Sequence, residues 1–188
     1  MPITQYLTAT SLDGFIADPG NSLEWLFAVE QGDGADDGWK SFMGQVGAMA
    51  MGATTYRWVL EHEQLLEHPE KWQEFYADRP CWVFSHRDLP AVPGADLRFV
   101  HGDVVPVHDE MRAAAGERNV WLMGGGALVA SFHEAGRLDE IRLNVAPVTL
   151  GGGAPLLPRR IEGLRLRSVR ENGQMVDLVY DVPPRNGS

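Results

Sequence analysis

The residues most able to do chemistry stand just after predicted strands. In the segment 51–56, a short apolar run ends at Gly52, and a predicted helix follows at once. After Ala53, either Thr54 or Thr55 is expected to cap this helix. Gly52 permits close approach of a ligand, and the first amides of a helix have no partner within it and attract phosphate. The segment therefore indicates a phosphate site, with an ordinary helix N-cap as the alternative.

A second polar segment follows the predicted strand at 81–84. It contains Ser85, His86 and Arg87 in sequence. A hydroxyl, an imidazole and a guanidinium gathered on one turn suit a terminal phosphate, because each can donate to a phosphate oxygen. A polar surface turn is the alternative interpretation.

A third segment places three glycines between a predicted buried strand and a helix. Gly124, Gly125 and Gly126 are followed by Ala127 and Leu128. A strand–helix turn does not need three glycines, whereas a ligand that touches the backbone in front of a helix dipole does. Taken together, the three segments predict a phosphate-bearing ligand, most simply a dinucleotide, that lies across one edge of a sheet.

Composition limits the alternatives. The chain has 188 residues, of which 44% are hydrophobic, and a formal net charge of −10, which disfavours nucleic acid as a partner. Cys81 is the single cysteine, so neither an internal disulfide nor a thiolate metal cluster is expected. The N-terminus lacks the basic and apolar regions of a signal peptide, and the apolar stretches are too short to span a membrane. We expect a cytoplasmic protein.

The elements that must position these segments alternate between strand and helix. Apolar runs and turn signals predict one domain, residues 1–188, with a mostly parallel central sheet between helices in a three-layer α/β/α arrangement. The strong turn signal Asn172-Gly173 predicts an antiparallel C-terminal hairpin. Strands are expected at 3–10, 48–51, 81–84, 97–100, 119–123, 141–145, 164–169 and 175–180, and the main helices at 36–46, 54–60, 72–76, 107–115 and 126–132.

Other motifs do not reach a function. His62 and His68 suggest a zinc-protease helix, but six residues on a helix put them on opposite faces, so we expect no metal. A dinucleotide fingerprint would need glycine where Val129 stands. Arg165 and Arg167 share one face of a predicted strand, which favours the solvated face of an outer strand over an anion site.

The order of the motifs resembles the dihydrofolate reductase superfamily, in the branch of the RibD C-terminal domain of the bifunctional riboflavin-pathway enzyme. The resemblance covers nearly the whole chain. It rests on the segments 7–17 (an "SLDGxIA" loop), 51–56 (an "MGRxTY" segment), 124–126, and 138–153 (a "VDELRLxVAPVxLGGG" stretch). It implies a dihydrofolate reductase-like fold, NADPH as the cofactor, and hydride transfer.

The resemblance also implies roles for residues. Ala9 and Ile16 would flank the nicotinamide. The pyrophosphate side would be held by Gly52, Ala53, Thr54 and Thr55. Ser85, His86 and Arg87 would lie near the adenosine 2′-phosphate, and the other face would be covered by Gly125, Gly126, Ala127 and Leu128.

Three departures from the family pattern concern the substrate and the phosphates. Ala53 stands where the family usually has arginine, which removes one phosphate contact. Gly124 replaces the usual glutamate of the third motif, and Leu7 replaces a basic residue in the first strand. The last two losses weaken binding of a ribose-phosphate substrate, so they argue against the riboflavin-pathway substrate itself.

Hydride transfer also needs a group that handles a proton. In dihydrofolate reductases a carboxylate on the helix before the "MGR" strand meets the pterin, and Asp36 has close to that spacing before Gly52, with Asp37 beside it. A helix N-cap is the alternative role for these carboxylates. The third possible carboxylate, Asp13, would anchor a loop.

The sequence therefore predicts an NADPH-dependent reductase of a small heterocyclic or carbonyl substrate. Two alternatives stay open: a nucleotide-binding protein without catalysis, and a riboflavin-pathway or folate reductase. A hydrophobic second half with terminal strands that need a cover also predicts a homodimer.

Overall fold

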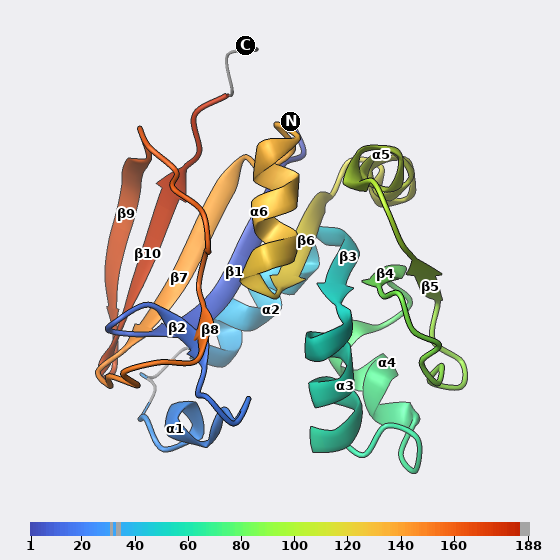
Figure 1. The fold of residues 1–188 in the computed structure, drawn as a ribbon, viewed down its shortest axis with the longest axis horizontal. Coiled ribbons are helices and arrows are strands. Elements are labelled where there is room, and N and C mark those ends of the chain that lie inside the picture. The colour runs from blue at the N-terminus through green and yellow to red at the C-terminus, as the bar shows by residue number, and fades with distance from the viewer. Residues whose placement is uncertain (31, 33–34, 185–188) are drawn as a thin grey trace.

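The computed structural model describes residues 1–30, 32 and 35–184, in which strands and helices alternate (Figure 1). The strands are β1 (Thr4–Ser11), β2 (Phe15–Ala17), β3 (Val46–Gly52), β4 (Cys81–Phe84), β5 (Leu97–Val100), β6 (Asn119–Gly124), β7 (Glu140–Ala146), β8 (Ala154–Pro155), β9 (Arg165–Asn172) and β10 (Met175–Asp181). The helices are α1 (Glu24–Phe27), α2 (Ala35–Gln45), α3 (Ala53–His62), α4 (Glu70–Tyr76), α5 (Val104–Ala115) and α6 (Gly126–Glu134). Among these described helices, none combines the length and apolar character needed to cross a membrane.

Eight strands form one sheet in the order β5-β4-β3-β6-β1-β7-β10-β9. The first six are parallel to their neighbours, while β10 runs antiparallel to β7 and β9 antiparallel to β10. The predicted mostly parallel sheet with an antiparallel C-terminal hairpin is confirmed. Because the six parallel strands end at the same edge, the loops after β4, β3, β6 and β1 lie in a row along it.

Helices cover both faces of the sheet, which confirms the three layers (Figure 1). The alternation of side chains along each strand explains why both faces need a cover. In β4, Trp82 belongs to the hydrophobic cluster under α5 and α6, whereas its neighbours Cys81 and Val83 belong to the cluster under α2, α3 and α4. The strands therefore read as continuous apolar runs in the sequence.

Several predicted boundaries are corrected. Helix α2 begins at Ala35, so Asp36 and Asp37 lie inside its first turn and do not cap it, where carboxylates still favour the helix dipole. Val46, expected at the end of this helix, begins β3. The hairpin loop is Gly173-Gln174, one residue later than predicted, because Asn172 is paired with Met175.

A separate two-stranded sheet of β2 and β8 lies beside the row of loops. It depends on Gly153, whose φ is +129° and where an added Cβ would lie 2.0 Å from the Ala17 carbonyl oxygen. The Leu156 amide then donates to the Gly14 carbonyl. These contacts fix Ile16 of β2 over the end of β6.

Candidate functional site

The glycine turns after β3 and β6 meet at the centre of the sheet edge. Met51 of β3 pairs with Gly124 of β6. An added Cβ on Gly52 would lie 3.7 Å from the Gly125 amide nitrogen, and one on Gly124 would lie 3.6 Å from Thr55 Oγ1. The structure therefore brings together the first and third segments that the sequence singled out.

The three consecutive glycines have three different reasons to be glycine. Gly124 has a φ of +135°, a conformation that side chains rarely adopt. At Gly126 an added Cβ would lie 2.3 Å from the Leu156 carbonyl oxygen, so packing within the protein excludes a side chain. At Gly125 an added Cβ would meet only Ile16 Cδ1, at 3.9 Å, so the space in front of it is open to a ligand.

Two helices begin at these turns without a side-chain cap. Gly52 is the N-cap of α3 and Gly125 is the N-cap of α6, and neither position has a side chain that accepts a hydrogen bond from the helix. The first amides of both helices consequently point toward the same region of the sheet edge, where they can bind an anion. The expectation that Thr54 or Thr55 caps α3 is wrong, because the helix already includes both residues.

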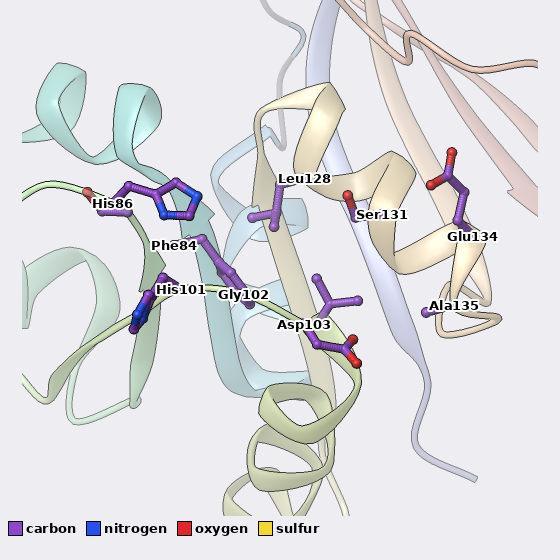
Figure 2. Close-up of a pocket in the computed structure, with 11 residues that line it drawn as sticks. Phe84, His86, His101, Gly102, Asp103, Leu128, Ser131, Glu134 and Ala135 are labelled. Carbon is purple, nitrogen blue, oxygen red and sulfur yellow. The ribbon is translucent and has the colours of Figure 1, made fainter.

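On one side of the glycine turns is a cleft of about 500 Å³, which we call the His86 cleft. Figure 2 shows its walls: His86 follows β4, His101 follows β5, and Leu128 and Ser131 come from α6. The rings of His86 and His101 meet edge to face with centroids 6.2 Å apart. Leu128 lines this cleft as well, so two predicted site segments, 85–87 and 125–128, contribute to it.

Within the second segment, the structure separates the three polar residues. Ser85 and His86 line the His86 cleft, and Arg87 is not among the described residues that do so. Ser85 Oγ donates to the Arg87 carbonyl at 2.8 Å and accepts from the Arg87 amide at 3.0 Å, so its hydroxyl shapes the turn.

Sequence reasoning missed part of the His86 cleft. His101 and Asp103 directly follow β5, and Ser131 and Glu134 belong to α6. The carboxylate of Asp103 caps α5 by accepting from the Val105 amide at 2.9 Å. Residues 85–87 were identified because they are polar and directly follow a strand. The same rule applies to residues 101–103 and could have found His101 and Asp103, but not the two residues within α6.

On the other side of the glycine turns is a larger cleft of about 1050 Å³, which we call the Arg142 cleft. Its walls are α2 and the sheet face of β1, β7, β10 and β9, with Leu26 of α1 at one side. Ala9 of β1 and Asp37 of α2 line it, as do the aromatic residues Trp39 and Phe42. The ring of Trp39 stacks on that of Phe42 with centroids 5.9 Å apart.

Strand register sets out the floor of the Arg142 cleft in rows. Leu7, Arg142 and Val179 are register partners across β1, β7 and β10. Two residues further along β1, the next row contains Ala9, Asn144, Asp177 and Arg170. Register partners point to the same face of a sheet, so each row is a line of neighbouring side chains.

In the second row, Asp177 is the centre of a hydrogen-bond network that also includes Asn172. Asp177 accepts from Asn144 Nδ2 at 2.6 Å, from Arg170 Nη2 at 2.9 Å and from Asn172 Nδ2 at 3.3 Å. Sequence reasoning interpreted the arginines of β9 as a solvated outer face. The strand is the outer strand and exposed, but Arg167 and Arg170 also line the cleft.

The candidate proton-handling carboxylates have different surroundings. Asp37 is exposed and lines the Arg142 cleft. Asp36 lies in the first turn of α2, but its side chain is outside the described residues. Asp13 is a loop anchor: it accepts from the Ser11 hydroxyl at 2.6 Å and from the Leu150 and Gly151 amides, and these bonds lower its pKa to about 2.

The metal expectation concerns His62 and His68. His62 ends α3, while His68 lies in the turn before α4. In the part of the chain that the structure describes, there is no group of three or more residues able to hold a metal ion.

The fold and the arrangement of the glycine turns define a class. The sheet order and the antiparallel C-terminal strands are those of dihydrofolate reductase-like proteins. The sequence profile of the RibD C-terminal domain family matches residues 2–176. The chain belongs to that family, as its motifs suggested.

Individual relatives match most of the chain. The protein YwjB of Bacillus subtilis (strain 168) is 32% identical over 174 residues, which cover 92% of this chain and 93% of the relative. A Shewanella sp. PV-4 protein assigned to riboflavin biosynthesis has a similar structure, with a TM-score of 0.75, 24% identity, and coverage of 96% and 99%. A pyrimidine reductase-like protein of Corynebacterium diphtheriae is similar in fold, with a TM-score of 0.64, 13% identity, and coverage of 97% and 92%.

Proposed function

We propose that this protein is an NADPH-dependent reductase that transfers a hydride to a small heterocyclic or carbonyl substrate. The observation that carries the proposal is the order of features across the sheet: the His86 cleft at β5 and β4 on the α6 side, the glycine turns at the ends of β3 and β6, and the Arg142 cleft at β1 and β7 on the α2 side. Three strand spacings separate β4 from β1, which is about 14 Å. An extended dinucleotide laid along this edge would reach from one cleft to the other.

The residues at the centre of this edge fit a pyrophosphate. The open space before Gly125 is a place that any side chain would fill, and the uncapped first turns of α3 and α6 supply amides and two positive helix ends. Ala53, Thr54 and Thr55 would hold one side and Gly126, Ala127 and Leu128 the other. When bound, NADPH supplies the hydride.

The chain's own residues would orient the two reactants. Ala9 and Ile16 offer small and apolar surface where the nicotinamide would lie, with Ile16 fixed near Gly125. Asp36, with Asp37 as the alternative, would hold or protonate the substrate at a ring nitrogen or carbonyl oxygen from α2. At the far end, His86, Ser85 and Arg87 would favour the 2′-phosphate of NADPH over the free hydroxyl of NADH.

The family name supports a reductase-like role without choosing the substrate. The pyrimidine reductase-like relative points to a heterocycle. However, Gly124 and Leu7 stand where a ribose-phosphate substrate would need a glutamate and a base. We therefore place a nucleotide-binding protein without catalysis second, and the riboflavin-pathway and folate activities third.

The test is NADPH oxidation followed by the loss of its absorbance, together with isothermal titration of NADPH and NADH. The substrate panel contains the riboflavin-pathway ribosylaminopyrimidine, dihydrofolate, and simpler cyclic imines and carbonyls. We expect NADPH to bind more tightly than NADH and at least one simpler compound to be reduced. Tight NADPH binding with no turnover on any substrate would favour the non-catalytic alternative, and equal affinity for both cofactors would contradict the NADPH preference.

We also propose a homodimer. The outer strand β9 is exposed along its length, with Leu166 and Val169 at the surface, and Val176 of β10 is exposed near them. An open edge with apolar residues pairs readily with another chain. Light scattering at micromolar concentration should give about twice the chain mass of 20.8 kDa; a particle of 20.8 kDa would contradict the proposal.

A further inference from the structure

A buried carboxylate holds the guanidinium of Arg142, and Arg142 lines the cleft. Its Nε donates to Glu140 Oε1, and Glu140 is fully buried. The Arg142 side chain itself is 32% exposed, so solvent or a ligand can reach it. Among the described residues, its Nη groups have no hydrogen-bond partner, which leaves donors on a fixed, partly desolvated cation.

The carboxylates that balance Arg142 lie away from the cleft. Glu140 also accepts from Arg167, and Arg167 is 2.7 Å from Asp181. Glu140 and Asp181 are not among the described residues that line the cleft, whereas Arg142 and Arg167 are. Asp177 and the exposed Asp37 do line it. The Asp177 oxygens already accept from Asn144, Arg170 and Asn172, and Asp37 has no described hydrogen bond or ion pair with Arg142. Among the described residues, no carboxylate meets the Nη donors of Arg142, so this donor edge can bind an anion from outside the protein.

Flat apolar surface lies beside this donor edge. Leu7 is the register partner of Arg142 on the neighbouring strand. The guanidinium carbon of Arg142 lies over the Phe42 ring, 6.0 Å from its centre, and the Trp39 ring stacks on Phe42. Aromatic walls and an aliphatic floor suit a planar ring system, because they bury its faces without leaving polar groups unpaired.

We propose that Arg142 is the specificity-determining residue of the substrate cleft, and that it selects flat aromatic or heteroaromatic substrates that carry a carboxylate or a similar anionic oxygen group. The ring system lies between Leu7 and the aromatic pair Trp39 and Phe42. The anionic group accepts from the Nη donors of Arg142. Glu140 acts as the positioning residue, because it fixes the guanidinium through Nε.

This inference rests on the proposed function, since it takes the Arg142 cleft as the substrate site. It also predicts the distance between the two functional groups of the substrate. The nicotinamide position proposed at Ala9 is one row, or two residues, further along β1 than Leu7. Two residues of a strand span about 6.6 Å. The reducible bond and the anionic group of the substrate should therefore be separated by about that length, as in a bicyclic ring or a para-substituted one.

The experiment compares two probes of equal shape and different charge. Binding of 2-naphthoate and its neutral analogue 2-naphthamide is measured by isothermal titration to the protein without cofactor. We expect the carboxylate to bind about 10-fold or more tightly, the usual effect of a hydrogen bond to a charged group. Equal affinities, or no binding of the carboxylate at millimolar concentration, would overturn the proposal.

Variants test whether the preference for the carboxylate probe comes from Arg142. Arg142→Gln should bring the two affinities within about twofold of each other. The matched control Arg98→Gln removes the same charge from exposed β5, where Arg98 pairs with Asp96, and should keep the full preference. Trp39→Ala should weaken both probes by the same factor. A preference that survives Arg142→Gln would exclude Arg142 as its source.

Folding is checked by circular dichroism for each variant. If Arg142→Gln does not fold, Arg142→Lys decides: it keeps the charge but loses the fixed fork, so the preference should fall without vanishing, and an unchanged preference would contradict a role for the fork. Neither probe requires NADPH. A carboxylate preference without NADPH binding would support the anion site at Arg142 and contradict the proposed reductase. NADPH binding without a carboxylate preference would support the reductase and contradict the anion site.

Discussion

The His86 cleft and the Arg142 cleft lie on opposite faces of one sheet and are built differently. Ser85, His86 and His101 belong to short loops that directly follow strands, and the rings of His86 and His101 meet edge to face. In the Arg142 cleft, the polar side chains stand on strand faces and are joined by hydrogen bonds and ion pairs. Apart from the contacting pair His86 and His101, substitutions should act more independently in the first cleft than in the second, because only the second is a hydrogen-bond network.

Between the two clefts, Gly125 allows the strongest test of their separation. Gly125→Val should abolish NADPH binding, because the side chain would fill the space proposed for the pyrophosphate, while a cleft for 2-naphthoate should remain. The fold should survive, since an added Cβ there meets only Ile16 at 3.9 Å. Titration of both ligands measures the two affinities, and circular dichroism checks the fold. Normal NADPH binding by Gly125→Val would mean that the turn has a structural role only.

Gly126 is the contrasting neighbour. Gly126→Ala should destabilise the fold by about 1–3 kcal/mol, because its Cβ would lie 2.3 Å from the Leu156 carbonyl oxygen.

The carboxylates of α2 should affect the Arg142 cleft alone. With a confirmed substrate, Asp36→Asn should lower the hydride-transfer rate about 10²-fold or more, the scale of general acid catalysis, and leave NADPH affinity nearly unchanged. Single-turnover kinetics measure the rate. If Asp37→Asn has this effect and Asp36→Asn does not, the role belongs to the exposed Asp37; if neither variant is slow, the proton comes from water.

The His86 cleft should set the choice of cofactor. His86→Ala should narrow the ratio of NADPH to NADH affinity about 10-fold, as expected for loss of one charge-assisted contact. Arg87→Ala should narrow it less, because Arg87 is not among the described residues that line the cleft. Titration calorimetry with both cofactors measures the ratio, and a larger effect of Arg87→Ala would reverse the order of the two residues.

The smallest effect concerns a histidine outside both clefts. His108 is buried on α5, its Nε2 lies 2.7 Å from Thr4 Oγ1, and burial lowers its pKa below the ordinary 6.5. The unfolded chain therefore takes up this proton at a higher pH than the folded protein does. Stability should fall as pH drops below 6.5, by at most about 1.4 kcal/mol per pH unit from this group.

Thermal melts of the wild type and of His108→Gln between pH 5 and 8 provide the measurement. The variant should show a shallower loss of stability on acidification. Identical pH dependence in the two proteins would mean that other groups cause the loss.

The sequence by itself determined the row of parallel strands and the residues that follow them. Each parallel strand is buried on both faces, so it reads as an apolar run with a clear end, and the residues after that end lie at a known edge of the sheet. In this way Gly52, Gly125 and His86 could be placed before the structure was known. The strand at 81–84 was predicted with its observed bounds for the same reason.

Only the tertiary structure decided what the floor of the Arg142 cleft contains. On β7 and β10, Arg142 and Asp177 alternate with apolar residues, and the sequence does not say which strands are neighbours or which row faces α2. The pairing of β7 with β1 on one side and β10 on the other sets these rows. Likewise, the separate roles of Gly125 and Gly126 depend on the distant segment 155–156, because local sequence carries no information about a backbone that approaches from elsewhere in the chain.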